Sequence, residues 1–306
     1  MHTFPKRSAA ARRLFRHVMP AFVSLGVLPF IACSPPPPAA PPEPPPPVPA
    51  PELIAEPPER EPESELEAAP AAGQPGVTGA VRAAVDATDR SEDDRVLDPQ
   101  RQPDRLLSFF GIAPGMRVAE LGAGGGYTTE LLARVVGPAG RVYGQNNKFV
   151  LERFAAGPWG ERLKKPALAN VTRVDTEFDA PLPDDARNLD AVLVVLFYHD
   201  TVWFGVDRKK MNTAVHRALK PGGVYGIVDH SARPGEGVSQ TKTLHRIEEA
   251  ALTKEVQEAG FVLEASADFL KNPEDTRDWN ASPSAAAERR GMSDRFVLRF
   301  KKPGGA

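Results

Sequence analysis

The sequence predicts a three-layer α/β domain built around a mostly parallel sheet of seven strands. Segments typical of strands and helices alternate from about residue 103 to residue 260. Residues 189–197 are almost entirely Val and Leu, as expected for a central parallel strand buried on both faces. A glycine-rich stretch at 122–126 connects a short apolar strand to a helix. Alternating elements of this kind favour helices on both faces of one sheet.

The elements are expected in a regular order. The first helices are expected within 81–95 and at 103–110, where Pro103 occupies a first helical turn. A third helix, 127–136, ends at Gly137 and Pro138. Apolar residues at helical spacing mark a helix from 211 to 219 before the break at 221–223, and another from 244 to 259 closed by Gly260. The expected strands are 116–121, 141–144, 171–175, 189–197, 224–228, 261–266 and 295–300. No long helix is evident between the last two strands, which predicts a terminal strand pair.

The N-terminal segment is typical of an export signal. Residues 1–17 carry five basic residues and no acid, and an apolar run follows at 18–32. That run is shorter than the roughly 20 residues needed for a membrane-spanning helix. Residues 30–33, Phe-Ile-Ala-Cys, resemble a bacterial lipobox, which implies lipid attachment at Cys33. Plain secretion and an uncleaved anchor remain alternatives. The expected location is the cell envelope, facing the periplasm, with the outer membrane favoured by Ser34.

A proline-rich tether is expected between this signal and the folded part. Of the 33 prolines, 17 lie between Pro35 and Pro75, a density that no packed domain tolerates. We therefore expect a signal peptide at 1–33, a disordered linker at 34–80 and a folded domain at 81–306. The net charge of -2 argues against nucleic-acid binding through bulk positive charge. The single Cys excludes an intrachain disulfide and a Cys-rich zinc site.

The glycine-rich stretch predicts a ligand-binding loop. Residues 118–127 read Val-Ala-Glu-Leu-Gly-Ala-Gly-Gly-Gly-Tyr. Tyr127 stands where the dinucleotide pattern G-x-G-x-x-G/A requires a small residue, and no Gly-Lys-Ser/Thr follows as in a P-loop. Glu120 precedes the first glycine by two residues, and a carboxylate there would repel a pyrophosphate. These features favour a ligand without phosphate and disfavour a dehydrogenase.

At these residues the sequence resembles class I S-adenosylmethionine-dependent methyltransferases. Their first motif, hydrophobic-x-Glu/Asp-x-Gly-x-Gly-x-Gly, is matched in place by Glu120, Gly122, Gly124 and Gly126. The resemblance extends from about residue 106 to 301 and includes Lys-Pro-Gly-Gly at 220–223. Residues 197–200, Phe-Tyr-His-Asp, are similar to a subgroup of uncharacterised predicted methyltransferases, often exported. The resemblance implies the class I methyltransferase sheet.

The resemblance also implies how S-adenosylmethionine would be bound as the cofactor. The methionine part would lie against Gly122, Gly124 and Gly126, and Glu120 would contact its amino end. Asn146 stands where the family has an acid that holds the ribose hydroxyls, which is a departure from the pattern. Restoring the acid is therefore expected to tighten binding. Asp175 would accept from the adenine amino group. Helix capping or solvation is the alternative reading of Glu120 and Asp175.

Candidate catalytic residues follow the strands at 189–197 and 224–228. Pockets in such sheets lie beyond the carboxyl ends of the strands, which selects Tyr198, His199, Asp200 and His230. We expect His199 to act as a general base oriented by Asp200, and Tyr198 to wall the pocket. The alternative is that His199 and Asp200 only cap the next helix.

No metal is expected; the alternative is a divalent-metal set of Asp200, Asp229 and His230, as in some catechol-type methyltransferases. His216 lies within a predicted helix and is expected to be structural or exposed. His245 is placed at a helix start, without an assigned role.

The sequence thus predicts methyl transfer to a small-molecule or lipid-like acceptor. The alternative is an envelope binding protein that kept the fold and lost turnover, which export and Asn146 both favour. A membrane contact is expected through the N-terminal lipid alone. The acceptor and the oligomeric state stay open.

Overall fold

The computed structural model describes residues 76–304. The predicted signal segment, Cys33 and the linker up to residue 75 lie outside the described residues. Within 76–304, no helix is both long and apolar enough to cross a membrane.

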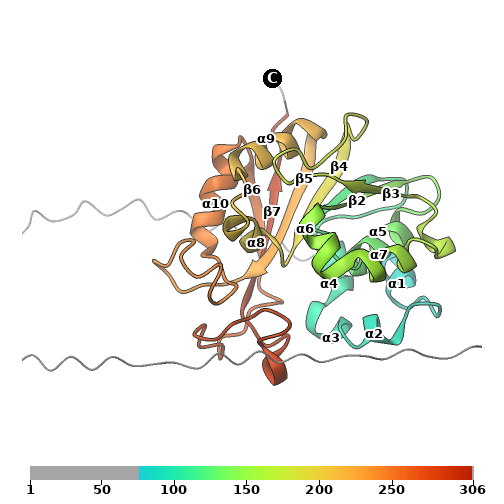
Figure 1. Cartoon of the computed structure of the whole chain (residues 1–306). Helices are drawn as coiled ribbons and strands as arrows, with labels where there is room; N and C mark the ends of the chain where they lie inside the picture. Colours follow the sequence, from blue (N-terminus) through green and yellow to red (C-terminus); the bar gives the residue numbers. More distant parts are fainter. Residues whose placement is uncertain (1–75, 305–306) are drawn as a thin grey trace, which may run out of the picture. The chain divides into compact units, whose positions relative to one another are not determined.

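A seven-stranded sheet forms the centre of the described part (Figure 1). Its strand order is β3-β2-β1-β4-β5-β7-β6, and only β7 runs antiparallel to its neighbours. This arrangement confirms the predicted fold class, a three-layer α/β domain around a mostly parallel seven-stranded sheet. The strands are β1 (Arg117–Leu121), β2 (Arg141–Asn146), β3 (Val171–Asp175), β4 (Leu189–Val195), β5 (Leu219–His230), β6 (Val262–Ala267) and β7 (Arg295–Lys301).

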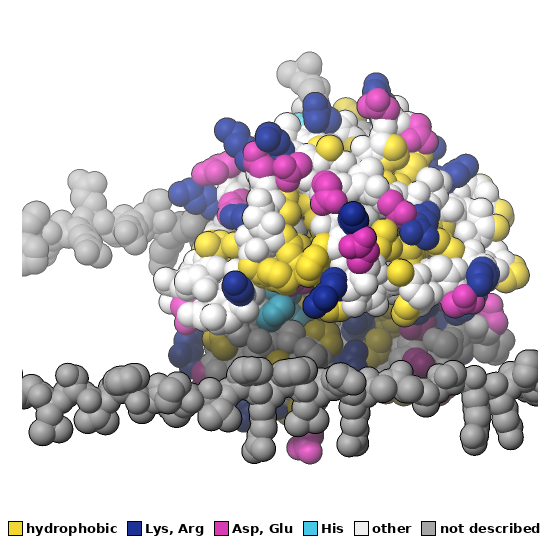
Figure 2. All heavy atoms as spheres, in the orientation of Figure 1, with side chains coloured by type: hydrophobic (Ala, Val, Ile, Leu, Met, Phe, Trp, Pro, Cys, Tyr) yellow, Lys and Arg dark blue, Asp and Glu magenta, His cyan; other side chains and the backbone are white. Residues whose placement is uncertain are grey.

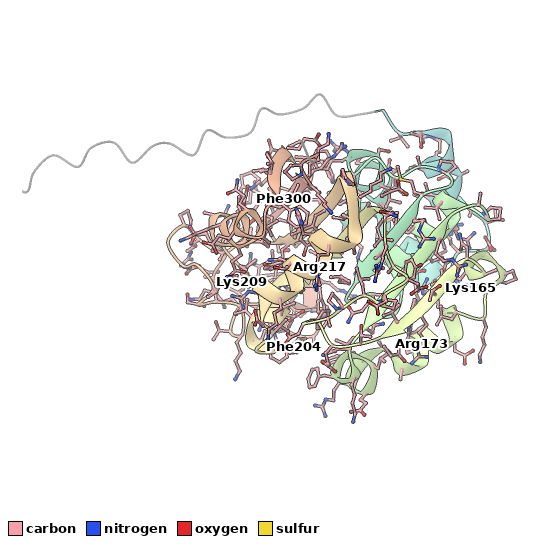
Figure 3. The ribbon with its side chains drawn as sticks, turned by 90° about the horizontal axis from the view of Figure 1, so that it is seen from above. Lys165, Arg173, Phe204, Lys209, Arg217 and Phe300 are labelled. Carbon is pink, nitrogen blue, oxygen red and sulfur yellow. The ribbon has the colours of Figure 1, made fainter. Side chains whose placement is uncertain are left out.

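Helices cover both faces of the sheet, and each face has its own buried core. Successive side chains of β1 point to opposite faces of the sheet. Val118 belongs to the buried cluster that includes residues of α1, α4 and α5, and Ala119 belongs to the cluster that includes residues of α9 and α10. In Figure 3, Arg173 marks the β3 edge and Phe300 marks β7, toward the opposite edge. The helices are α1 (Gly79–Val85), α2 (Glu92–Arg95), α3 (Asp98–Arg101), α4 (Pro103–Phe109), α5 (Tyr127–Val136), α6 (Lys148–Val150), α7 (Ala156–Arg162), α8 (Tyr198–Trp203), α9 (Arg208–Ala218) and α10 (Glu249–Glu258), with π- or 3₁₀-helical turns η1 (Leu151–Ala155), η2 (Pro166–Leu168) and η3 (Ala287–Arg289).

Two expected boundaries were wrong. Strand β5 begins at Leu219, so Pro221 lies inside it rather than breaking the chain. The pairing with β4 shifts register between Leu189 and Ala191, and proline is tolerated at such an irregularity. Helix α10 begins only at Glu249, because the fully buried Ile247 instead bridges to Ser231 at the end of β5. The short helices α6, α7 and α8 were not predicted.

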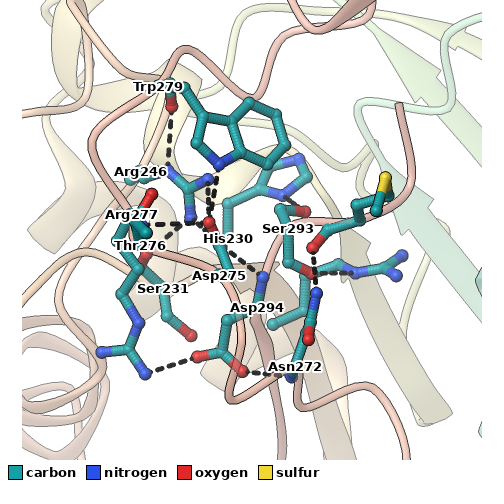
Figure 4. A network of polar contacts seen from close by, with 12 residues as sticks. His230, Ser231, Arg246, Asn272, Asp275, Thr276, Arg277, Trp279, Ser293 and Asp294 are labelled. Carbon is teal, nitrogen blue, oxygen red and sulfur yellow. Dashed lines mark hydrogen bonds and ion pairs between the residues drawn. The ribbon is translucent and has the colours of Figure 1, made fainter. Parts of the chain in front are cut away.

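A buried ion pair connects the segment that follows β5 to the segment that follows β6 (Figure 4). The Arg246 and Asp275 side chains are fully buried and lie 2.7 Å apart, Nη1 to Oδ2. Arg246 also donates to the carbonyls of Ser231 and Trp279. The Asp275 carboxylate accepts from the Trp279 indole and from the backbone N–H groups of Asp294 and Arg277. One pair thus joins the end of β5, the segment before α10 and the long segment between β6 and β7.

Replacement of Arg246 by Met should destabilise the protein by about 3–5 kcal/mol, because Asp275 would remain buried without its cation. Adding Asp275→Asn should recover part of this loss, since the amide oxygen still accepts hydrogen bonds without carrying a charge. Urea unfolding of the wild type, both single variants and the double variant measures the coupling. Equal losses in Arg246→Met and the double variant would show that the buried charge is not the cause.

Candidate functional site

The candidate site lies beyond the carboxyl ends of β1, β2, β4 and β5. Strand β1 leads into the glycine loop at 122–126, and α5 begins directly after it. The glycines at 122, 124 and 126 all have positive φ, between 56° and 84°. At Gly124 an added Cβ would meet no atom within 4 Å, so the backbone there faces open space. This is a surface that a ligand can approach closely.

Three consecutive amide side chains stand at the end of β2, and we call Gln145, Asn146 and Asn147 the amide triplet. The first two hold the glycine loop. Gln145 Oε1 accepts from the N–H of Gly122 at 3.1 Å. Asn146 bonds Gly124 twice, accepting from its N–H at 2.8 Å and donating to its carbonyl at 3.1 Å. Asn147 caps α6 by accepting from the N–H of Val150. Two uncharged side chains therefore order the loop at Gly122 and Gly124, while the charged Arg162 side chain donates to the carbonyl of Gly125 at 2.6 Å.

The structure gives Asn146 a contact that its predicted role does not include. Its side chain is fully buried and turned toward Gly124, so it supports the loop, and its contact with a ribose stays a prediction. An acid at this position would lose the donor to the Gly124 carbonyl. Asp175 is half-exposed on the edge strand and paired with Arg173, with the charged atoms 2.8 Å apart. Its contact with adenine stays a prediction.

Glu120 lies beneath the glycine loop. Its side chain is almost fully buried and accepts a hydrogen bond from the Thr129 hydroxyl in the first turn of α5. Burial raises the pKa of Glu120 to about 7, although hydrogen bonds from Thr129 and Thr128 oppose this shift. Near neutral pH the carboxyl group thus carries only part of a charge.

A group of aromatic side chains connects the glycine loop to the residues after β4, and we call Phe149, Phe154, Phe197, Trp203 and Phe204 the aromatic cluster. The Phe197 ring covers Gly122, where an added Cβ would lie 2.5 Å from it. Phe204 joins Phe197 to Phe149, with ring centroids 6.0 and 5.0 Å away. Phe154 is 68% exposed. Figure 2 shows hydrophobic side chains beside a histidine on this face, and Figure 3 labels Phe204. A ligand over Gly122 would have to displace Phe197.

The carboxylate of Asp229 holds His199 in place. Its Nδ1 lies 2.6 Å from Oδ1 of Asp229 at the end of β5, and its backbone N–H donates to Oδ2 of the same carboxylate. Burial alone would lower the pKa of His199, but the charges of Asp229 and Asp200 outweigh it and hold the pKa above its usual value. The ring orientation is thereby fixed, and Nε2 points away from Asp229.

Two further side chains converge on Nε2 of His199. Nδ1 of His245 lies 3.3 Å from it, and Oδ1 of Asp200 lies 3.4 Å from both ring nitrogens. The Trp203 indole donates to the same Asp200 oxygen, and its ring lies 6.2 Å from that of His245. The three side chains therefore form a compact group beside the aromatic cluster.

Of the other two predicted catalytic residues, Tyr198 is turned away from His199, whereas the His230 ring lies 5.6 Å from the His199 ring and its catalytic role stays a prediction. Tyr198 is fully buried, donates to Glu255 and accepts from Asn212, so it packs toward α9 and α10 and does not wall the pocket. The His230 ring lies 2.7 Å, Nδ1 to Oγ, from Ser293, and burial holds its pKa well below the usual value. The considered metal set of Asp200, Asp229 and His230 does not converge, because Asp229 faces His199 Nδ1 and backbone N–H groups.

His245 is the site residue that the sequence analysis left without a role. It lies four residues before α10, in a turn where its φ is 51°, an uncommon value for a residue other than glycine. No spacing motif connects it to His199, 46 residues earlier.

Comparison with known proteins finds sequence similarity in the part of the chain that carries the glycine loop. Residues 102–174 match the family model described as Protein-L-isoaspartate(D-aspartate) O-methyltransferase (PCMT). A protein-L-isoaspartate O-methyltransferase of Aeropyrum pernix is 37% identical over 70 residues, which are 23% of this chain and 25% of that protein. The chain thus matches about a quarter of the length of this relative. These matches confirm the resemblance to class I S-adenosylmethionine-dependent methyltransferases.

Solved structures with a similar fold include two methyltransferases. One is an S-adenosylmethionine-dependent methyltransferase from Aquifex aeolicus, 20% identical, with a TM-score of 0.48, covering 69% of this chain and 97% of that one. The other is geranyl diphosphate C-methyltransferase from Streptomyces coelicolor, 16% identical, with a TM-score of 0.48, covering 76% and 91%.

Replacement of Glu120 by Gln should remove a pH dependence of stability. Because the pKa of Glu120 is raised from 4.5 to about 7 on folding, the folded protein binds the extra proton between these values. The free energy of unfolding should therefore fall as pH rises from 4.5 to 7 and stay low above it. At pH 8, Glu120→Gln should be more stable than wild type by about 2–3 kcal/mol.

The matched control is Glu130→Gln on α5. Glu130 is also buried, but hydrogen bonds from Lys165 and Arg134 and the charge of Arg162 overcome burial and lower its pKa. Its replacement should therefore lower stability at pH 8. Denaturant unfolding at pH 5 and pH 8 distinguishes the two signs, and destabilisation of Glu120→Gln at pH 8 would contradict the prediction.

Proposed function

We propose that this chain is an S-adenosylmethionine-dependent methyltransferase. The observation that carries the proposal is the glycine loop after Glu120, at the strand-to-helix junction, inside the residues that match the PCMT family model. The open backbone at Gly124 is a cradle that an added Cβ would fill, so the loop fits the extended methionine part of the cofactor. The fit is not complete, because no acid follows β2 where the family holds the ribose.

In this proposal the chain binds and orients the reactants. The bound cofactor would supply a methyl group on a positively charged sulfur, already activated for transfer. The protein then has to align an acceptor atom and exclude water. Phe197 and Phe204 lie between the loop and the His199 group, which suits both tasks. His199, fixed by Asp229, is oriented to take up the proton of an acceptor hydroxyl or thiol.

The acceptor side favours a molecule with apolar or aromatic surface. Phe149 and Phe154 are exposed next to Trp203 and Phe204, an arrangement on which such a surface can pack. The match to the PCMT model ends at residue 174, before β4 and β5 bring in His199 and Asp229. Isoaspartyl protein is thus a second candidate acceptor, and it rests on the family description alone. The proposed location in the cell envelope rests on the sequence.

Titration calorimetry with S-adenosylmethionine and S-adenosylhomocysteine tests cofactor binding. Gly124→Val should abolish it, because the side chain would occupy the open space at the loop and strain a φ of 56°. Gly137→Val is the matched control, since Gly137 ends α5, also has positive φ and also faces open space. Binding lost equally in both variants would point to misfolding, and a wild type that binds neither ligand at millimolar concentration would sink the proposal.

Asn146→Asp should weaken cofactor binding about tenfold or more, the reverse of the sequence-based expectation. The new carboxylate would face the Gly124 carbonyl without a proton to donate, and a lost or repulsive buried contact costs roughly 1–3 kcal/mol. Asn170→Asp is the matched control, because Asn170 also donates to backbone carbonyls, those of Ala133 and Gly137, away from the loop. Dissociation constants of the three proteins in one buffer provide the measurement. Tighter binding in Asn146→Asp would restore the ribose-ligand interpretation.

A further inference from the structure

We infer that His199, Asp200 and His245 form a binding site for a divalent transition-metal ion such as Zn²⁺. Nε2 of His199, Nδ1 of His245 and Oδ1 of Asp200 lie at the corners of a triangle with sides of 3.3, 3.4 and 3.4 Å. Three ligands bound at ~2.1 Å in a tetrahedron stand about 3.4 Å apart. A single ion can therefore reach all three atoms without a rearrangement of the backbone.

The distribution of hydrogen atoms among His199, Asp200 and His245 also favours binding of a cation. Nδ1 of His199 faces the Asp229 carboxylate at 2.6 Å and is its natural hydrogen-bond donor, so in the neutral ring the lone pair lies on Nε2. Among the three converging atoms, only the ring nitrogen of His245 can then carry a hydrogen, and it can satisfy only one of its two neighbours. A metal ion would accept electron pairs from all three atoms at once.

Neighbouring groups hold each of the three proposed ligand side chains in position. The buried Asp229 orients His199 through Nδ1, the carboxylate–histidine arrangement that fixes the tautomer and raises ligand basicity. The Trp203 indole holds Asp200 at 2.8 Å. His245 is held in a left-handed turn by its neighbour Arg246, which is locked onto Asp275. Each ligand thus has its own positioning contact.

Two nitrogens and one carboxylate oxygen leave a fourth position free, as in catalytic rather than structural zinc sites. The side chains of Asp200 and His245 are partly exposed, at 16% and 22%, so this position is open to an incoming group. An acceptor hydroxyl or thiol bound there would lose its proton more readily. With the ion bound, Nε2 of His199 is a ligand, so the ion takes the place of His199 in promoting this proton loss. This last step rests on the proposed function, whereas metal binding does not.

The test uses the full chain after removal of metal with a chelator. Calorimetry with Zn²⁺ alone should show one ion per chain, and Co²⁺ should give the visible absorption of a low-coordinate site with nitrogen and oxygen ligands. His245→Asn should weaken binding at least 100-fold, and asparagine tolerates the left-handed backbone at this turn. Asp229→Asn should weaken it 10- to 100-fold while leaving the ligands in place.

His216→Gln is the matched control, because His216 lies on α9 against Phe261 and should not change the affinity for Zn²⁺. Thermal unfolding with and without Zn²⁺ gives a second readout, since the ion should raise the melting temperature of wild type and not that of His245→Asn. No binding at one ion per chain, or equal affinity in wild type and His245→Asn, would overturn the inference. Titration with S-adenosylmethionine is separate, so either proposal can fail while the other stands.

Discussion

The buried ion pair between Arg246 and Asp275 anchors the turn that brings His245 to His199. Burying two charges is costly, and the pair is sustained because the carboxylate also accepts from two backbone N–H groups and an indole. It ties the segment before α10 to the long segment between β6 and β7. His245 precedes Arg246, so the same anchor sets the position of His245 against His199. A hydrophobic pair of similar volume would lack these directional contacts.

Local patterns in the sequence predicted most of the sheet. The Val- and Leu-rich run became β4, and the glycine loop became the junction between β1 and α5, because both features depend on residues close together in the chain. The terminal strand pair was also predicted, and β7 does pair with β6. The boundary errors arose where tertiary contacts overrode local signals. Pro221 is accommodated beside a register shift, and Ile247 pairs with Ser231 before α10 can begin.

The site was predicted less completely, because its contacts join distant segments. His199 and Asp200 follow a strand end and could be selected by position, whereas His245 meets them only through the anchored turn. Tyr198 stood in the same tetrapeptide but faces Asn212 and Glu255, since the helical turn after β4 directs neighbouring residues to different sides. The family match stops before all of these residues, so their roles depend on the geometry alone.

The amide triplet has a consequence for how the glycine loop meets its ligand. The N–H groups of Gly122 and Gly124 are already ordered by Gln145 and Asn146, and neither partner carries a charge. Because the loop is already ordered, it loses little conformational entropy when a ligand binds. The amide side chains do not titrate, so the order that they impose at Gly122 and Gly124 does not depend on acidity. The carbonyl of Gly125 instead accepts from Arg162, which is paired with Asp94 and Glu130. A response of affinity to salt or acidity would then report on Glu120 below the loop or on Arg162 and its carboxylate partners beside it.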